Sequence, residues 1–338
     1  MKVKKWTVSI IIVVSLIGLI GCSEKTSKEE ELEKKIAELE KKVEEEQKEK
    51  EEALKRQIEI EEEEQVIMVD VVDPHTKKVI KTINPVEMGY GTDNEKYKAE
   101  IESWVTELAR GSENRVGYDQ RMIPDKIGMN GEIVKGKPRI ILEESELVEK
   151  VMNASEKGEA VELPLYVFES GYRPEEAAYL SEVVIASYTT HFNSGVAGRS
   201  KNIELSAAAI NNIILGTNDI FSFNTTVGPS DAAHGYQPAP EILNGKLVDG
   251  IGGGICQTSS TLFNAVDKLG VSYIEWHHHS LNVGYVPKGR DATVSYGGLD
   301  FRFENTTGIP LLIKAIVHEG SLTVEIRTSK ENQTLLAH

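Results

Sequence analysis

The chain has 338 residues, a formal net charge of −16, 40% hydrophobic residues and 27% charged residues. This length suits two folded domains, and the composition excludes a polytopic membrane protein, a wholly disordered chain and a disulfide-rich scaffold. The acidic balance argues against nucleic acid as a partner, because phosphate binding needs a basic surface.

Residues 1–21 have the pattern of a lipoprotein signal peptide. Three lysines precede an apolar stretch at residues 8–20, which is short for a helix that spans a membrane. The stretch ends in Leu-Ile-Gly directly before Cys22, and this ending resembles the bacterial lipobox. The resemblance implies lipidation of Cys22 and removal of residues 1–21. The alternative is an uncleaved anchor helix, and both interpretations place the rest of the chain at the extracytoplasmic face of the cell membrane.

Residues 22–65 combine the lipidated cysteine with a charged helical stalk. Residues 23–65 carry 18 acidic and 10 basic side chains, so half of the net charge lies in this stretch. Leu32, Ile36, Leu39 and Val43 recur at spacings of 4, 3 and 4, which is a coiled-coil seam. We expect a helix of roughly 40 residues, either solvated as a single helix or paired as a homodimer.

Residues 66–170 predict an α+β domain. Residues 66–72 and 78–82 read as the strands of a hairpin, joined by a turn at residues 73–76 that contains His75. Further along, helices are expected at residues 97–109 and 144–154, and strands at 139–142 and 161–168. Four stretches resemble the peptidoglycan-binding domain often found upstream of VanW domains: residues 108–111, 117–119, 135–138 and 163–166. This resemblance implies peptidoglycan or cell-wall peptides as a partner.

Residues 171–330 predict a second α+β domain, followed by a tail at 331–338. Helices are expected at residues 174–188 and 202–212. The stretch Gly252-Gly253-Gly254-Ile-Cys256-Gln257 then leads into a helix that ends at Gly270. Free amides and the helix dipole at a helix start favour an anion, so we expect a lowered thiol pKa at Cys256. The alternative is a structural cysteine beside a packed glycine turn.

Several stretches of this second domain resemble the VanW family in order. They are residues 199–203, 221–224, 252–257, 279–280 and 291–294, and the resemblance spans residues 173–327. Trp276 departs from the pattern, since an arginine commonly stands there. The family occurs in vancomycin-resistance clusters and in other cell-envelope proteins, so the resemblance implies a role at the cell wall, by binding peptidoglycan or its precursors.

Three functions remain open at this level. The first is acyl transfer on peptidoglycan peptides, with Cys256 as nucleophile, His279 as base and Asp291 as its orienting group. Amides near Cys256 and the Gln257 side chain would hold the oxyanion, and His277 or Asp300 could replace the named partners.

The second function is a metal-binding module. If the histidines lie on a strand, His277 and His279 share a face, and they would act with Cys256, His234 or Asp291. No tight ligand spacing supports this, so we predict neither a metal nor a cofactor. The third function is a non-catalytic binding module, in which the glycine turn, residues 252–254, lines a ligand pocket.

Overall fold

The computed structural model describes residues 27–63, 67–112, 115–243 and 246–336. The chain divides into two compact units, residues 1–66 and 67–338. The expected signal peptide and Cys22 lie outside the described residues. Within the described part, no helix is both long enough and apolar enough to cross a membrane.

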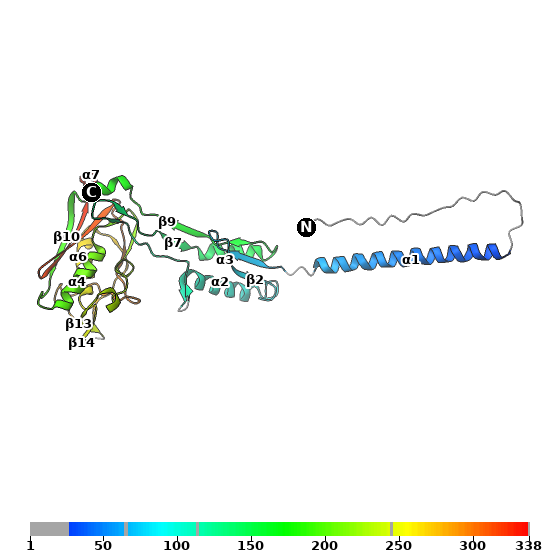
Figure 1. Ribbon diagram of the computed structural model, residues 1–338, viewed down its shortest axis with the longest axis horizontal. Helices are drawn as coiled ribbons and strands as arrows, with labels where there is room; N and C mark the ends of the chain where they lie inside the picture. The colour runs from blue at the N-terminus through cyan, green and yellow to red at the C-terminus, as the bar shows by residue number, and fades with distance from the viewer. Residues whose placement is uncertain (1–26, 64–66, 113–114, 244–245, 337–338) are drawn as a thin grey trace. The chain divides into compact units, whose positions relative to one another are not determined.

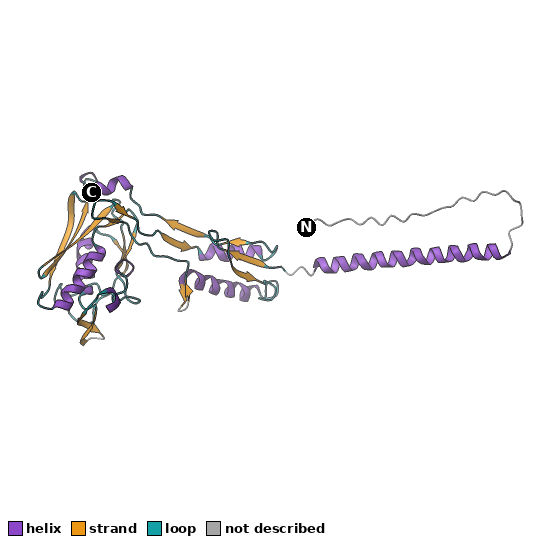
Figure 2. Ribbon diagram, in the orientation of Figure 1, coloured by secondary structure: helices purple, strands orange, loops and turns teal. Residues whose placement is uncertain are grey.

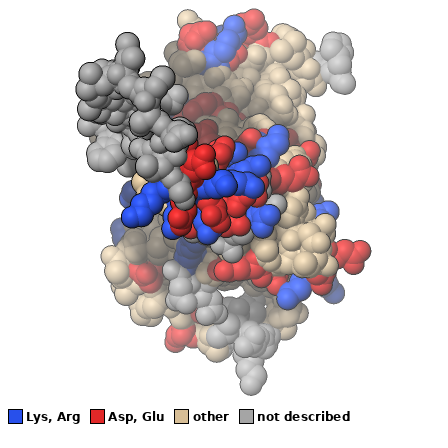
Figure 3. Space-filling view, turned by 90° about the vertical axis from the view of Figure 1, so that its right-hand side faces the viewer, with Lys and Arg blue, Asp and Glu red and all other residues tan. Residues whose placement is uncertain are grey.

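The described part of the first unit is one long helix, α1 (Ser27–Glu63), drawn in blue in Figure 1. The predicted long helix is confirmed over these residues. Its apolar seam is solvent-exposed, with Leu39 at 61% and Val43 at 51% exposure. Lys55 pairs with Glu51 one turn earlier, at 3.3 Å, and such exposed pairs stabilise a helix only slightly. Figure 3 shows basic and acidic side chains interspersed on the face in view.

Residues 67–170 begin with a three-stranded sheet covered by two helices (Figure 2). The strands run in the order β2, β1, β8: Val79–Ile83, Val69–Val72 and Val161–Glu162. The hairpin prediction is confirmed, and Asp73 Oδ1 accepts the His75 and Thr76 amides at 2.8 Å each, which closes the turn. The helices are α2 (Asn94–Arg110) and α3 (Glu144–Ala154), both as predicted.

Short strands complete this region. Two pairs stand apart from the main sheet, β3 (Gly111–Ser112) with β4 (Arg115–Val116), and β7 (Arg139–Leu142) with β9 (Leu165–Phe168). The expected strand at residues 161–168 is therefore divided between β8 and β9, because each half pairs with a different partner.

The C-terminal part is built on a six-stranded sheet in the order β10, β18, β17, β11, β5, β6. Their bounds are Val183–His191, Ser321–Thr328, Leu311–His318, Ile213–Leu215, Lys126–Ile127 and Ile133–Val134. The hairpin of β5 and β6 comes from the region before residue 171, so the two predicted α+β regions share this sheet. The α+β fold class is confirmed.

One expected helix is wrong. Residues 174–188 contain only the 3₁₀ turn η1 (Pro174–Tyr179), and strand β10 then begins at Val183. The stretch Val-Val-Ile-Ala-Ser-Tyr-Thr-Thr-His is rich in β-branched residues, which favour strands. It pairs antiparallel with β18 almost throughout.

Two helices pack against this sheet and position the site. They are α4 (Ala197–Ile210) and α6 (Ile255–Val266), which contact each other as well as strands β10, β17 and β18. Smaller elements close the region: β12 (Ile220–Ser222), α5 (Phe223–Val227), η2 (Ala232–His234), β13 (Pro238–Leu243), β14 (Lys246–Ile251), η3 (Asp267–Leu269), β15 (Ser272–Glu275), β16 (Arg302–Glu304) and α7 (Lys330–Gln333).

Candidate functional site

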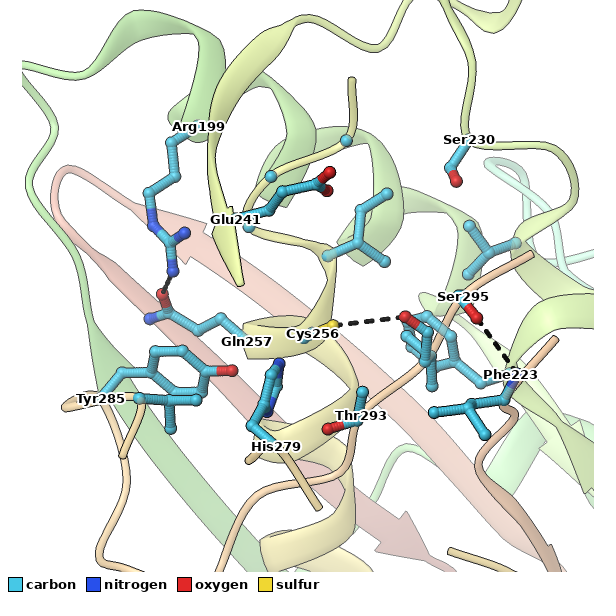
Figure 4. Close-up of a pocket in the computed structure, with 18 of the residues that line it drawn as sticks. Arg199, Phe223, Ser230, Glu241, Cys256, Gln257, His279, Tyr285, Thr293 and Ser295 are labelled. Carbon is cyan, nitrogen blue, oxygen red and sulfur yellow. Dashed lines mark hydrogen bonds between the residues drawn. The ribbon is translucent and has the colours of Figure 1, made fainter. Parts of the chain in front are cut away.

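A cavity of about 1000 Å³ surrounds the start of helix α6. It is lined by the glycine turn at residues 252–254, by Cys256 and by His279. Further lining residues come from helix α4, hairpin β13–β14 and the segment 278–299. Segments far apart in the sequence therefore contribute to one site. Figure 4 shows the labelled side chains around the Cys256 sulfur.

The glycine turn is what allows α6 to begin inside the cavity wall. Gly252 and Gly254 have φ of +95° and +116°, a region that other residues rarely adopt. A Cβ on Gly253 would lie 2.4 Å from the Ala239 carbonyl oxygen, so only glycine fits there. Gly254 is the N-cap of α6, and Cys256 is the second residue of that helix, as the sequence predicts.

The amide of Cys256 differs from the amides on either side of it in having no hydrogen-bond acceptor among the described residues. The neighbouring amides are used by the turn, Ile255 N–H by Gly252 O at 3.1 Å and Gln257 N–H by Gly254 O at 3.0 Å. The first amides of a helix have no acceptor within the helix. The Cys256 N–H donates no hydrogen bond to any group in the described part of the chain. It is thus the free donor of the three.

The Cys256 thiol is protonated in this environment. Its sulfur donates to Val294 O at 3.4 Å. Burial raises the pKa of the thiol to about 11, and the contributions of Val294 and the Arg199 guanidinium offset only part of the rise. The expected lowering of the thiol pKa by the helix start is therefore wrong for the free protein, because the loss of hydration outweighs it.

His279 and Asp291 form a hydrogen-bonded pair in the same cavity wall. His279 Nδ1 lies 2.7 Å from Asp291 Oδ2, and the His279 amide donates to that oxygen, also at 2.7 Å. Burial alone would raise the pKa of the Asp291 carboxyl, but the hydrogen bonds from His279 and His278 lower it. Trp276 adds support, since its Nε1 donates to Asp291 O at 2.9 Å. In Figure 4 the His279 ring is drawn just below Cys256.

The three residues named for acyl transfer thus meet at one cavity, with one link not formed. Asp291 orients His279, and both His279 and Cys256 line the cavity. No hydrogen bond joins Cys256 to His277 or His279 among the described residues, and the thiol bonds to Val294 instead. Contacts between nucleophile and base are often loose in unliganded sites and tighten when substrate binds.

The other two candidate partners lie elsewhere. Strand β15 ends at Glu275, so the histidines are not on a strand and the expected alternation of faces is wrong. His278 and His279 both contact Asp291, whereas His277 Nε2 pairs with Glu275 at 3.1 Å. Asp300 accepts hydrogen bonds from Arg121, Ser222 and Asn224 rather than from a histidine.

Gln257 has a different role from the one expected. Its side chain is fully buried, and its amide nitrogen donates to Thr190 Oγ1 and to His191 O, at 3.0 Å each. Both N–H groups are therefore used, and none is left for an oxyanion. Its carbonyl oxygen accepts from the Arg199 guanidinium at 2.8 Å. Gln257 thus positions Arg199 rather than the reacting carbonyl.

The cavity residues that the sequence did not single out include Arg199, Glu241 and Tyr285. Burial raises the pKa of the Tyr285 phenol far above its usual range, so this side chain is a neutral hydrogen-bond donor. Arg199 lies in one of the stretches that resemble the VanW family, which is the one signal that could have drawn attention to it. Glu241 and Tyr285 belong to no local pattern.

No group of three or more His, Cys, Asp or Glu side chains among the described residues is arranged to hold a metal ion. His234, a suggested ligand, instead has its Nδ1 2.7 Å from Asp231 Oδ1. The metal-binding alternative therefore has no ligand set in this part of the chain.

The fold and the site define an α+β domain in which a glycine turn presents a cysteine at a helix start, in one cavity with a histidine–aspartate pair. Residues 198–327 match the sequence model of the family described as "VanW like protein". This match agrees with the resemblance to the VanW family seen in the sequence.

Two curated proteins are similar to this chain. The "Uncharacterized protein YoaR" of Bacillus subtilis is 48% identical over 155 residues, which cover 46% of this chain and 51% of that protein. The "Vancomycin B-type resistance protein VanW" of Enterococcus faecalis is 28% identical over 139 residues, covering 40% and 50%. The chain thus spans about half the length of the curated relatives it matches. No solved structure matches it.

Proposed function

We propose that this protein is a cysteine acyltransferase that acts on peptidoglycan peptides at the outer face of the cell membrane. The observation that carries the proposal is the cavity itself. It brings together a thiol at a helix start, a free helix amide and a histidine already oriented by a carboxylate. In acyl transfer the thiol would be the nucleophile, the amide would donate to the oxyanion, and the histidine would be the general base.

The chemistry would run in two halves. His279 removes the proton from the Cys256 thiol as the sulfur attacks the substrate carbonyl carbon, and the oxyanion that forms is held by the Cys256 amide. His279 then gives the proton to the leaving amine, the C–N bond breaks and a thioester remains. An acceptor amine attacks the thioester while His279 takes its proton, and the thiol is regenerated when that proton passes to the sulfur.

The protonation state of the thiol decides which form of catalysis is required. A thiol with a pKa of about 11 is neutral at pH 7, so a preformed thiolate–imidazolium pair is not the resting state. Deprotonation must accompany attack, and His279 is the base within reach of the cavity. The His279 Nδ1–H group donates to the Asp291 carboxylate, which leaves His279 Nε2 free to accept the proton from the Cys256 sulfur.

The place and substrate class rest on the sequence. The lipobox-like ending before Cys22 supports anchoring by a lipid, and the charged helix α1 supports a stalk above the membrane. Segments that resemble a peptidoglycan-binding domain precede the VanW-like domain. The cavity, at about 1000 Å³, is at the upper end of small-molecule sites and is large enough for a short peptide.

A second candidate function is non-catalytic binding of the same peptides. One observation favours it: the thiol is protonated and bonds to Val294 O rather than to a histidine. In that case the glycine turn and the charged cavity residues would recognise a peptide without turning it over.

Turnover of stem peptides by the full chain in detergent would separate the two functions. Acyl transfer predicts a peptide adduct on Cys256 by intact mass, and cross-linked or exchanged products by liquid chromatography and mass spectrometry. Cys256→Ser should abolish turnover, and His279→Gln should lower it about 10²–10⁴-fold. His277→Gln is the matched control, since that histidine lies outside the cavity lining.

Two outcomes would contradict acyl transfer. Undiminished turnover by Cys256→Ser would remove the proposed nucleophile. No adduct and no product, together with equal peptide affinity of the native chain and Cys256→Ser, would establish the non-catalytic function instead.

A further inference from the structure

Two charged side chains of the cavity have no oppositely charged partner among the side chains that the structure describes. They are Arg199 and Glu241, which both line the cavity. The other carboxylate of the site, Asp291, is already bonded to His279. Both side chains are partly buried. Withdrawing a charge from water without a partner is costly, so a ligand group of opposite charge would be favoured beside each.

Arg199 is held in place as if for recognition. It is the third residue of α4, and its guanidinium donates to Gln257 Oε1 at 2.8 Å. The same guanidinium lies over the Tyr285 ring, 5.8 Å from its centroid. One neutral acceptor and one aromatic ring fix the orientation but leave the charge uncompensated. The remaining N–H groups of the Arg199 guanidinium can donate two parallel hydrogen bonds to a carboxylate of a ligand.

Glu241 provides the opposite charge at a separate point. It lies in strand β13, and its carboxylate occupies the space over Gly250, where a Cβ would come within 2.0 Å of Oε1. Burial raises the pKa of the Glu241 carboxyl, and no hydrogen bond to a cation offsets this in the described part of the chain. In Figure 4 Arg199 and Glu241 are both drawn above Cys256, on different elements.

We infer that the cavity binds a dipolar peptide, with a free carboxylate of the ligand against Arg199 and a free ammonium group against Glu241. This inference rests on the proposed function in that it names the substrate class of the same cavity. Arg199 and Glu241 are then specificity residues, and Gln257 is a positioning residue that acts through Arg199. A peptide with both groups would neutralise the two unpaired charges at once, which a neutral or singly charged ligand would not do.

The test modifies the ligand and the protein in parallel. The full chain carrying Cys256→Ala, which prevents turnover, is titrated calorimetrically with a synthetic tetrapeptide of stem sequence that contains one diamino residue. The peptide is used as the free acid, as the C-terminal amide and with the side-chain amine acetylated. Each modification should weaken binding at least about 10-fold, as expected for loss of a charge-assisted hydrogen bond.

The protein variants assign these losses to residues. In Arg199→Gln the acid and the amide should bind alike, and Arg199→Lys should recover part of the preference for the acid. In Glu241→Gln the free and acetylated amines should bind alike. Lys201→Gln and Glu204→Gln are the matched controls, because they make the same charge changes on the exposed surface of α4. Thermal unfolding checks that each variant is folded.

The outcomes separate this inference from the proposed function. Sensitivity to amidation that persists in Arg199→Gln, or sensitivity to acetylation that persists in Glu241→Gln, would overturn the assignment. So would equal binding of all three peptides by the parental chain. Because Cys256 is absent throughout, these results do not depend on acyl transfer, which the turnover experiment tests independently.

Discussion

Alkylation of Cys256 should be slow at neutral pH and should accelerate about tenfold per pH unit through pH 9.5. The thiolate is the reactive form, and burial raises the pKa of this thiol to about 11. At pH 7 about one molecule in 10⁴ is then thiolate, compared with about 3% for an unperturbed thiol with a pKa near 8.5. The reactive fraction is lower by about 300-fold.

The observed rate should fall by less than that, because a thiolate of higher pKa is intrinsically more nucleophilic. With a Brønsted coefficient of about 0.45, the difference of about 2.5 pKa units restores about 13-fold. Cys256 should therefore react with iodoacetamide about 20-fold more slowly than the same cysteine in the unfolded chain at pH 7. Shielding by the cavity walls would slow it further, so this is the smallest expected difference.

The measurement is labelling of the full chain, read from the peptide that contains Cys256 by mass spectrometry. Cys22→Ser removes the second thiol, and the chain unfolded in denaturant gives the reference rate at each pH. Arg199→Gln should slow labelling further, because the guanidinium stabilises the thiolate, whereas Lys201→Gln should not. A rate that levels off between pH 5 and 7, or that exceeds the reference at pH 7, would refute the reasoning. It would mean that the helix start and Arg199 outweigh burial.

Two further predictions concern the turn and the stalk. Gly254→Ala should lower the free energy of unfolding by about 1–3 kcal/mol, because residue 254 has φ +116° and its Cβ would lie 3.1 Å from Arg199 Cγ. Denaturant unfolding measures this change. The control Gly270→Ala should cost less, because residue 270 has φ +67° and open space around it. If helix α1 pairs with a second copy, Leu39→Asp should shift the full chain from dimer to monomer in sedimentation equilibrium, while Ala37→Asp, off the seam, should not. An unchanged mass for Leu39→Asp would exclude pairing through this seam.

The elements that sequence predicted well are those whose signals are local. The turn after β1, helix α3 and the helix that begins beside Cys256 are each specified by capping residues, turn residues or an apolar face within a few positions. Strand β10 was missed because its partner β18 lies more than a hundred residues later. The sequence Pro-Glu-Glu-Ala-Ala-Tyr starts a helical turn as expected, and only long-range pairing makes the following residues extended.

In the site, too, the residues with local sequence signals could be predicted, and the properties that depend on the fold could not. Cys256 and the pair of His279 and Asp291 could be proposed from residue type and order along the chain. Their electrostatics could not, because the raised thiol pKa depends on how far the fold withdraws the partly buried Cys256 from water. Glu241 and Tyr285 were missed since each reaches the cavity from a separate segment without a motif. A charge without a partner is visible only when the surroundings of that residue are known.

The region before residue 171 bears on this cavity through one buried carboxylate. The Asp300 side chain is 1% exposed and pairs with Arg121 at 2.9 Å. The same carboxylate accepts the Asn224 amide at 2.9 Å and the Ser222 hydroxyl at 2.6 Å. Asn224 in turn donates its side-chain amide to Ser295 O and Leu299 O, and all three of these residues line the cavity. A cation from the first α+β region therefore compensates the charge that fixes one wall of the site. Together with the hairpin β5–β6 in the shared sheet, this link makes residues 67–170 part of the scaffold of the cavity.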